Sequence, residues 1–316
     1  MPDASASPNG ILLVDKPQGI TSHDVVARAR RALGTRKIGH AGTLDPMATG
    51  LLILGVGPAT RLLTYIVGLD KTYEATIRLG VSTDSDDADG TTTAQADAAT
   101  LAAVTDERIR DGIAALTGEI SQVPSTVSAI KIGGKRAYDL ARAGEEVQLK
   151  ARTVTVSRFE VRPSTSSGTG AGSAAASGSR DGVIDLDVVV DCSSGTYIRA
   201  LARDLGAALG VGGHLTALRR TRIGPFRVAD AATDLTGDLP LLPPADVATA
   251  VLGAFPVTAD EARDLRHGKR LAGAADRLAE LPTATPAAID PDGRLVGIVE
   301  RRGGDVKSAM NMAEDA

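Results

Sequence analysis

One short loop holds the residue best suited to make or break a bond. Residues 39–50 read Gly-His-Ala-Gly-Thr-Leu-Asp-Pro-Met-Ala-Thr-Gly, and the apolar run that follows predicts a buried strand. Gly42 and Gly50 permit unusual backbone angles and close approach of a ligand, while Pro46 favours an extended conformation at Asp45. The pattern therefore predicts that the Asp45 carboxylate is presented by the loop and is not packed against the core. The competing interpretation is an aspartate that only caps a turn.

Few other residues offer chemistry of their own. The chain has a single cysteine, Cys192, and no Cys/His cluster with the spacing of a zinc site. A lone cysteine forms no internal disulfide, which fits a reducing compartment, so a cytoplasmic protein is expected. We also find no signal-peptide pattern and no apolar stretch near the ~20 residues of a membrane span, so no membrane partner is expected.

Charge is distributed unevenly along the chain. The net charge is −4, which argues against a uniformly basic nucleic-acid binder. Residues 84–119 contain nine acidic and two basic residues, whereas residues 196–228 contain six arginines and one aspartate. Phosphate binding needs a local positive potential, so the second segment is compatible with RNA. On charge alone, a solvated surface explains it equally well.

Strands and helices are predicted on both sides of the loop, from the period of apolar residues and from Gly, Pro and capping residues. The predicted strands are 11–14, 37–39, 51–56, 71–79, 127–132, 153–161, 183–190 and 215–223. The predicted helices are 21–33, 59–67, 105–116, 136–142 and 198–209.

Composition also suggests a division into domains. Three prolines in 238–246 predict a boundary, with a larger catalytic domain over 1–238 and a small C-terminal module over 246–316. The module has strand-like segments at 287–289 and 295–299, and its last dozen residues are expected to fray. Residues 164–179 contain only Ser, Thr, Gly and Ala, and we expect a disordered insertion in a hairpin.

Four segments resemble motifs of one family. The loop at 39–50 resembles the catalytic motif of the TruB family of tRNA pseudouridine synthases, and 10–17 with 21–24 extends the resemblance upstream. The family's other motifs resemble Asp-Lys-Thr-Tyr-Glu-Ala at 70–75, Ser-Ser-Gly-Thr-Tyr-Ile-Arg at 193–199 and His-Leu-Thr-Ala-Leu-Arg-Arg-Thr at 214–221. Together they cover about residues 10–228 in the family's order, which makes chance similarity negligible.

The resemblance implies a fold and an activity. The fold class is α+β: a pseudouridine synthase fold with a mixed, largely antiparallel sheet flanked by helices, plus a small C-terminal β module of the PUA-like, RNA-binding type. The implied activity is isomerisation of the T-loop uridine at position 55 of tRNA, in which the N-glycosidic bond breaks and the base rejoins through carbon. No metal and no organic cofactor is implied.

The resemblance also assigns roles to individual residues. Asp45 would be the catalytic carboxylate, attacking the base or the sugar or acting as a base on the sugar. Arg199 would pair with it, and Tyr73 would contact the target base as a candidate proton carrier. Taken alone, Tyr73 would be a packing residue and Arg199 a surface arginine. The other implied substrate-binding residues are His40, Tyr197, Leu218 and Lys16, of which Lys16 would also support the Asp45 loop.

An RNA substrate adds a requirement for phosphate contacts. The target base must leave its stack to reach Asp45, as bases in RNA loops can. Phosphate contacts would fix the register of the RNA without reading its sequence. The candidates for these backbone contacts are Arg219, Arg220 and Arg222.

Three alternative functions differ in what they require of the sequence. One is a tRNA-folding factor in which catalysis is secondary or lost, although Asp45, Tyr73 and Arg199 together argue against loss. The second is a guide-RNA-dependent relative that acts on ribosomal or small nuclear RNA within a complex. The short C-terminal part favours a stand-alone enzyme with no obligatory protein partner. A glycosidase is disfavoured, since no motif supplies a second catalytic carboxyl group.

Overall fold

The computed structural model describes residues 7–125, 131–132, 135–136, 149–163, 177–180 and 182–312. The chain divides into two compact units. Unit 1 comprises residues 1–46, 50–68 and 223–316, and unit 2 comprises residues 47–49 and 69–222. The predicted boundary at 238–246 lies within unit 1, which groups the C-terminal module with the N-terminal elements.

The N-terminal part of unit 1 is built on an antiparallel pair of strands. β1 (Gly10–Lys16) runs against β3 (Thr49–Val56), with Gly10 opposite Val56 and Lys16 opposite Gly50. A short strand, β2 (Ile38–Ala41), also pairs with β3. β3 is buried along its whole apolar run, as the sequence predicted. The loop that carries Asp45 therefore joins two strands of one sheet.

Helix α1 (Ser22–Ala32) follows β1 and begins where the sequence predicted. The Thr21 side chain accepts a hydrogen bond from the backbone of Asp24, and the Asp24 carboxylate accepts one from the backbone of Thr21. This reciprocal cap satisfies two donors that a helix start leaves open. Val25, Val26 and Ala29 form the buried face. The helix predicted at 59–67 is instead a 3₁₀ turn, η1 (Gly57–Leu62), followed by one α-helical turn, α2 (Leu63–Ile66).

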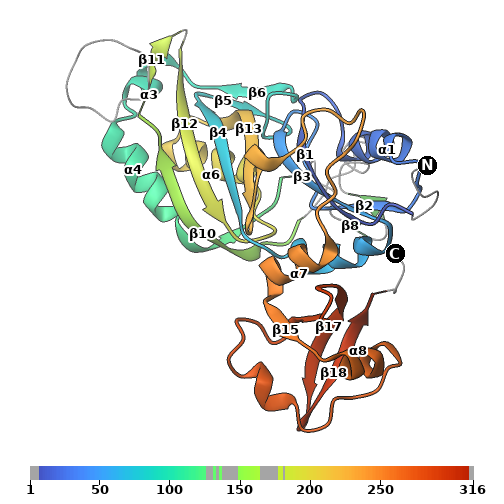
Figure 1. Ribbon diagram of the computed structural model, residues 1–316. Helices are drawn as coiled ribbons and strands as arrows, with labels where there is room; N and C mark the ends of the chain where they lie inside the picture. Colours follow the sequence, from blue (N-terminus) through green and yellow to red (C-terminus); the bar gives the residue numbers. More distant parts are fainter. Residues whose placement is uncertain are drawn as a thin grey trace. The chain divides into compact units, whose positions relative to one another are not determined.

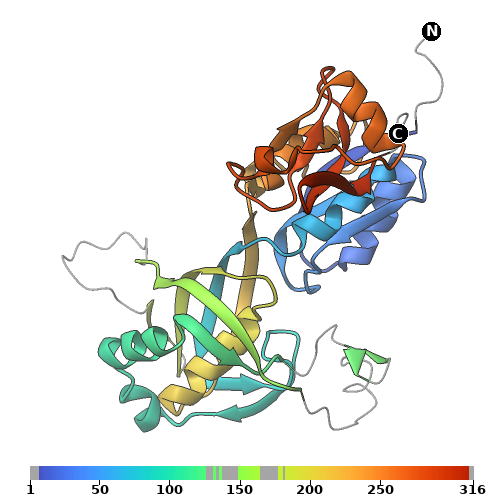
Figure 2. The ribbon, with the colours of Figure 1, turned by 90° about the horizontal axis from the view of Figure 1, so that it is seen from below.

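The C-terminal module of unit 1 is a four-stranded sheet with helices. Its strands lie in the order β15 (Ala254–Pro256), β16 (Ala287–Ile289), β17 (Leu295–Arg302) and β18 (Asp305–Asn311), and only the β15–β16 pair is parallel. Helix α7 (Pro244–Leu252) precedes the sheet, and α8 (Ala259–Arg266) packs on β17 and β18 (Figure 2).

The prediction that the last dozen residues fray was wrong for residues 305–311, and residues 313–316 lie outside the described part of the chain. β18 occupies residues 305–311 and pairs with β17 over most of its length. Its register places Val306 and Met310 in buried positions, at 0% and 8% exposure, where they contribute to the module's interior. The sequence signal for this strand was weak, because only these two positions are both apolar and buried. A half-buried strand is expected to have an apolar residue at every second position.

Unit 2 contains an antiparallel sheet with two helices packed on it (Figure 1). The strand order is β13 (Gly213–Ile223), β4 (Lys71–Leu79), β12 (Val183–Cys192), β10 (Arg152–Val161) and β7 (Gly118–Gln122). Helices α4 (Asp106–Ala115) and α6 (Ile198–Leu209) contact each other, and each contacts the sheet. The predicted positions of β4, β10, β12, α4 and α6 are confirmed to within two residues.

Smaller elements complete unit 2. They are β5 (Val81–Thr83), β6 (Thr92–Gln95), α3 (Ala98–Ala102), β8 (Lys131–Ile132), β9 (Lys135–Arg136) and β11 (Ser177–Arg180). The pair β5–β6 forms a separate antiparallel ribbon. Most of the predicted strand at 127–132, the helix at 136–142 and the insertion at 164–179 lie outside the described residues.

Candidate active site

The loop carrying Asp45 is anchored by buried residues on both sides. Leu44, Met47 and Ala48 are each at most 4% exposed, whereas Asp45 between them is partly exposed. The buried hydroxyl of Ser22 donates to the Leu44 carbonyl at 3.1 Å and accepts from the Leu44 amide at 2.9 Å. The residue before Asp45 is thereby fixed to the start of α1, and the carboxylate is held without being enclosed.

Lys16 holds the other side of the same loop. Its side chain is fully buried at 0% exposure, and Nζ donates to the carbonyls of Pro17 at 3.0 Å, Ile20 at 2.7 Å and Pro46 at 3.3 Å. The Gly19 amide also donates to the Pro46 carbonyl, at 2.9 Å. The ammonium charge is thus shared among backbone dipoles at a point directly after Asp45. This geometry agrees with a lysine that supports the loop.

His40 precedes the loop on β2 and is partly exposed. Its ring packs edge-on against the ring of His23 on α1, with the centroids 5.7 Å apart. A histidine at this place is therefore oriented by a second histidine, which sequence reasoning did not single out. His23 lies in the Thr-Ser-His-Asp segment that extends the family resemblance, so a signal for it was present.

In unit 2, strand β4 carries one predicted site residue, Tyr73. Tyr73 is 8% exposed, and Lys71 lies two residues before it on the same face of the strand at 5% exposure. Burial, reinforced by the nearby charge of Arg220, lowers the pKa of Lys71 to about 8. Cys192 lies directly across the ladder from Lys71, and burial raises the pKa of its thiol to about 11. These two buried groups are therefore neutral more readily than their ordinary pKa values suggest.

Arg199 is held deep inside unit 2 by an aspartate that the sequence did not single out. Its guanidinium lies 3.2 Å from the Asp87 carboxylate and donates to the Ser85 carbonyl at 3.0 Å. The side chains of Arg199 and Asp87 are 4% and 6% exposed, so this is a buried ion pair. Asp87 falls within the acidic stretch 84–119, where we interpreted the charges only as a group.

Gln122 fixes Tyr197, the residue directly before helix α6, on which Arg199 lies. Its buried side chain accepts from the Tyr197 amide at 2.8 Å and donates to the Tyr197 carbonyl at 3.1 Å. Tyr197 is the residue before the first turn of α6, so this pair of bonds sets where the helix starts. Tyr197 is partly exposed, and Leu218 on β13 is 7% exposed.

A second arginine of α6 binds the same acidic loop. Arg203 lies 3.3 Å from Asp86 and donates to the Val123 carbonyl at 2.7 Å. Burial raises the pKa of Asp86, while a hydrogen bond from Ser125 and the charge of Arg203 oppose that rise. Two successive carboxylates therefore bind two arginines one helical turn apart on α6.

The three arginines predicted to contact RNA differ in exposure. Arg219 is partly exposed and its Nη1 lies 3.4 Å from the Thr49 hydroxyl. Arg222 is partly exposed and donates to the Thr72 hydroxyl at 2.9 Å. Arg220 is 1% exposed. A phosphate contact needs an accessible guanidinium, so the burial of Arg220 is at odds with its predicted role.

The predicted residues therefore fall into two groups. Unit 1 brings Lys16 and the Asp45 loop together, with His40 on the strand before the loop. Unit 2 holds Tyr73, Arg199, Tyr197 and Leu218. The predicted pairing of Asp45 with Arg199 would join the two groups, and it stays a prediction.

Among the described residues there is no group of three or more His, Cys, Asp or Glu side chains placed to hold a metal ion. Within the same residues, no helix is both long and apolar enough to cross a bilayer.

Three family descriptions match successive parts of the chain. "TruB family pseudouridylate synthase (N terminal domain)" matches residues 30–198. "tRNA pseudouridylate synthase B C-terminal domain" matches residues 199–236, and "tRNA Pseudouridine synthase II, C terminal" matches residues 253–313. The matches cover parts of both units, including the C-terminal module of unit 1.

Curated relatives are similar over nearly the whole chain. A protein from Leifsonia xyli subsp. xyli named tRNA pseudouridine synthase B is 54% identical over 312 residues, which is 97% of this chain and 97% of that protein. A protein of the same name from Arthrobacter sp. is 53% identical, covering 96% of this chain and 97% of its own length.

Solved structures show the same fold at lower identity. A chain in the structure of an H/ACA RNP bound to a substrate RNA containing 2'-deoxyuridine has a TM-score of 0.66 and 22% identity, covering 97% of this chain and 86% of its own. A chain of an archaeal box H/ACA sRNP Nop10–Cbf5 complex has a TM-score of 0.65 and 24% identity, covering 97% of this chain and 86% of its own. The solved structures show the fold, and the family matches and the relatives of more than 50% identity place the chain in the TruB family of pseudouridylate synthases.

Proposed function

We propose that this protein converts the T-loop uridine at position 55 of tRNA to pseudouridine, with Asp45 as the catalytic nucleophile. The observation that carries the proposal is the partly exposed Asp45 carboxylate on a loop fixed by Ser22 and Lys16. The names of relatives at about 50% identity supply tRNA as the substrate class. The position within tRNA comes from the family resemblance.

The chemistry requires a group that responds to the loss of the base. As the N-glycosidic bond breaks, an electron-poor centre forms, and a held carboxylate captures or stabilises it. The base then turns and bonds to the sugar through carbon, and this displaces the carboxylate wherever it has added. The proton on that carbon is lost and the former glycosidic nitrogen gains one, so the product is an isomer of the substrate. Tyr73 is proposed to contact the base and carry a proton. Arg199 is proposed to pair with Asp45 and to orient its carboxylate, because a guanidinium forms strong charge-assisted hydrogen bonds to a carboxylate.

The remaining residues are proposed to hold the everted nucleotide and its strand. Tyr197 and Leu218 would line the base, and His40, oriented by His23, would contact the flipped nucleotide. Arg219 and Arg222 would bind phosphates. Arg220 is omitted from this group because it is buried.

The test compares Asp45→Asn with Asp111→Asn. Asp111 is an exposed residue of α4 and serves as the matched control. Each purified protein is given unmodified tRNA without guide RNA or other proteins, and pseudouridine is mapped chemically. We expect the unaltered chain and the control to mark one T-loop position and Asp45→Asn to mark none. Activity in Asp45→Asn, or a requirement for added proteins, contradicts the proposal.

The same variant separates catalysis from RNA folding. If refolding of tRNA is a property of binding alone, Asp45→Asn keeps it while making no pseudouridine. A folding assay run with both aspartate variants therefore shows whether the alternative function coexists with isomerisation.

A further inference from the structure

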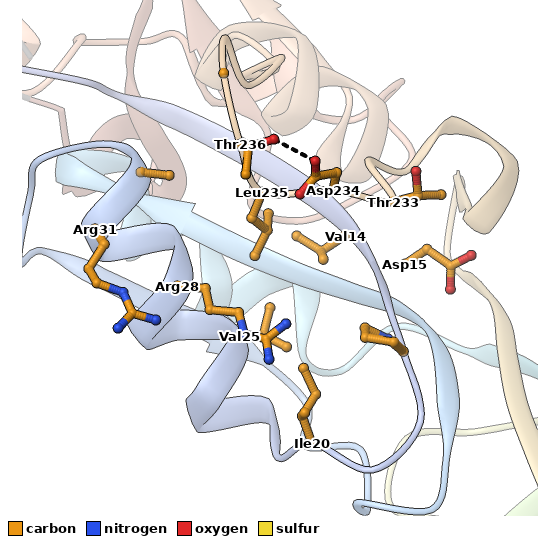
Figure 3. A pocket seen from close by; sticks show the side chains of 13 residues that line it. Val14, Asp15, Ile20, Val25, Arg28, Arg31, Thr233, Asp234, Leu235 and Thr236 are labelled. Carbon is orange, nitrogen blue, oxygen red and sulfur yellow. Dashed lines mark hydrogen bonds between the residues drawn. The ribbon is translucent and has the colours of Figure 1, made fainter.

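A cavity of about 500 Å³ lies within unit 1 and takes no part in the proposed reaction. Its walls come from the end of β1, from α1 and from residues 233–237 (Figure 3). This volume is within the ~300–1,000 Å³ range of small-molecule sites. The cavity therefore has the size, and the enclosure by three separate segments, of a binding site.

The cavity exists because one segment leaves the sheet between two anchors. The Ala232 amide donates to Leu13 at 2.9 Å and the Leu242 amide donates to Ile11 at 2.8 Å, so both positions follow the edge of β1. The residues between them bulge outward over α1. Two fixed ends make the bulge a defined wall of the cavity.

Opposite charges line opposite sides of this space. Arg28 and Arg31 extend from α1 on one side, and Asp15 and Asp234 lie on the other (Figure 3). Asp234 is oriented by a hydrogen bond from the Thr236 hydroxyl. Neither guanidinium donates a hydrogen bond to any residue that the structure describes. Both arginines are exposed residues of the lining, and the charge of Arg28 also helps lower the pKa of Asp24 one turn earlier on α1.

Apolar side chains separate the two charged sides. Val14 and Val25 are at most 2% exposed and belong to the core beneath the cavity, while Ile20 and Leu235 are partly exposed at its wall. A simple anion would leave this surface and the carboxylates unused. A simple cation would meet two guanidinium groups. The ligand must therefore combine an anionic end, an apolar body and hydrogen-bond donors.

We propose that this cavity binds a phosphorylated nucleoside. The phosphate would accept from Arg28 and Arg31, as guanidinium groups bind phosphate in a bidentate manner. The base would lie against Ile20 and Leu235, and amino or hydroxyl donors would face Asp15 and Asp234. The nucleotide is either free in solution or an unpaired residue of a bound RNA strand.

Lys16 connects the wall of the cavity to the Asp45 loop by hydrogen bonds within unit 1. Pro17 and Ile20 line the cavity, and their carbonyls accept from Lys16, which also donates to Pro46. A ligand in the cavity thus contacts the turn that supports the catalytic loop. The binding itself is independent of the reaction, and its test uses no activity measurement.

Because the chain contains no tryptophan, a single introduced one reports on its own surroundings. Thr233→Trp places it on an exposed residue at the cavity wall, and Val67→Trp places it on an exposed residue elsewhere in unit 1. Each full-length variant is titrated with AMP, adenosine, inorganic phosphate and a short single-stranded oligonucleotide. AMP or the oligonucleotide should change the fluorescence of Thr233→Trp and leave that of Val67→Trp unchanged.

The arginines are then removed in the Thr233→Trp background. The double replacement Arg28→Ala/Arg31→Ala should weaken binding of AMP by about tenfold or more, since each replacement removes a charged hydrogen bond to the phosphate. Adenosine, which has no phosphate, should bind the unreplaced Thr233→Trp protein comparably weakly. Arg36→Ala, an exposed arginine outside the cavity, should leave binding unchanged. Binding of AMP identifies a free nucleotide, and binding of the oligonucleotide alone identifies an RNA strand. No response to either, or equal binding after loss of both arginines, overturns the proposal.

Discussion

The Arg199 guanidinium lies 3.2 Å from the Asp87 carboxylate in the interior of unit 2. Breaking such a buried pair leaves one uncompensated charge, which costs ~3–5 kcal/mol, whereas replacing both partners by apolar residues is often neutral. This asymmetry makes it possible to separate what Arg199 does for the fold from what it does for catalysis.

The first prediction concerns Asp87→Leu and the double variant Asp87→Leu/Arg199→Met. The single variant should lower the free energy of unfolding by about 3–5 kcal/mol, and the double variant should regain most of that loss. The double variant should nevertheless form no pseudouridine, because the Arg199 guanidinium is gone. Urea unfolding and tRNA mapping measure the two effects. An active double variant would show that Arg199 has only a structural role.

The second prediction concerns Lys16→Met. Removing Nζ leaves the carbonyls of Pro17, Ile20 and Pro46 without this donor. Hydrogen bonds to charged groups contribute ~1.5–3 kcal/mol each, and partial access to water offsets some of the loss, so we expect about 2–4 kcal/mol lower stability. Turnover should fall more than tRNA affinity, because small misplacements of a reacting group are costly.

Lys37→Met is the control for this lysine. Lys37 is exposed and lies before β2, so its replacement should leave both stability and turnover within the range of ordinary surface changes. Single-turnover rates and filter binding separate the chemical step from affinity. Equal losses in Lys16→Met and Lys37→Met would remove the basis for a supporting role of Lys16.

The third prediction follows from the lowered pKa of Lys71. Its pKa is about 8 in the fold and 10.5 ordinarily, so between these values the unfolded chain binds more protons than the folded chain. Stability therefore rises with pH across this window, and below about pH 8 the buried charge carries its full cost, on the order of 3 kcal/mol at most. Lys71→Met should be the more stable protein at pH 7.

Comparing the pH dependence of the free energy of unfolding in the unaltered protein and in Lys71→Met isolates the contribution of the Lys71 ammonium group. The raised pKa of Cys192 lowers stability between about pH 9 and 11, but it is present in both proteins and largely cancels. The difference in free energy of unfolding should shrink as pH rises from 8 to 10.5. A difference that stays constant over this range would mean that folding does not lower the pKa of Lys71, and that the lysine keeps its proton in the folded chain.

The sequence was most informative where periodicity and capping agree. β4 was predicted with its observed limits, because alternating apolar residues fix both register and face. α1 began at the predicted cap, because Thr21 and Asp24 satisfy each other locally. Lys16 was linked to the Asp45 loop by family resemblance, and the structure supplies the hydrogen bond to Pro46.

Long-range partners were less accessible. Asp87 binds Arg199 across more than a hundred residues of chain, and no local pattern distinguishes it from Asp86 or Asp84. Arg220 looks like its neighbours in sequence, yet it is buried beside Lys71 while Arg219 and Arg222 stay accessible. Tertiary packing, which selects among equivalent residues, decided both cases.

The last prediction concerns Gly206, where helix propensity and packing oppose each other. Gly206 lies inside α6, so alanine should gain ~1 kcal/mol from propensity. A Cβ there would lie 2.2 Å from the Gly212 carbonyl carbon and 2.2 Å from the Gly213 amide nitrogen, both backbone atoms. Because the backbone there cannot move aside as a side chain can, Gly206→Ala should destabilise the protein by about 3 kcal/mol or more.

Ala207→Gly, one residue along the same helix and exposed, gives the reference. It should lose only the ~1 kcal/mol of helix propensity, since that side chain is exposed. Thermal unfolding should therefore place Gly206→Ala well below Ala207→Gly. The reverse order would mean that β13, which begins at Gly213, can move away from α6, and with it Leu218 of the proposed base pocket.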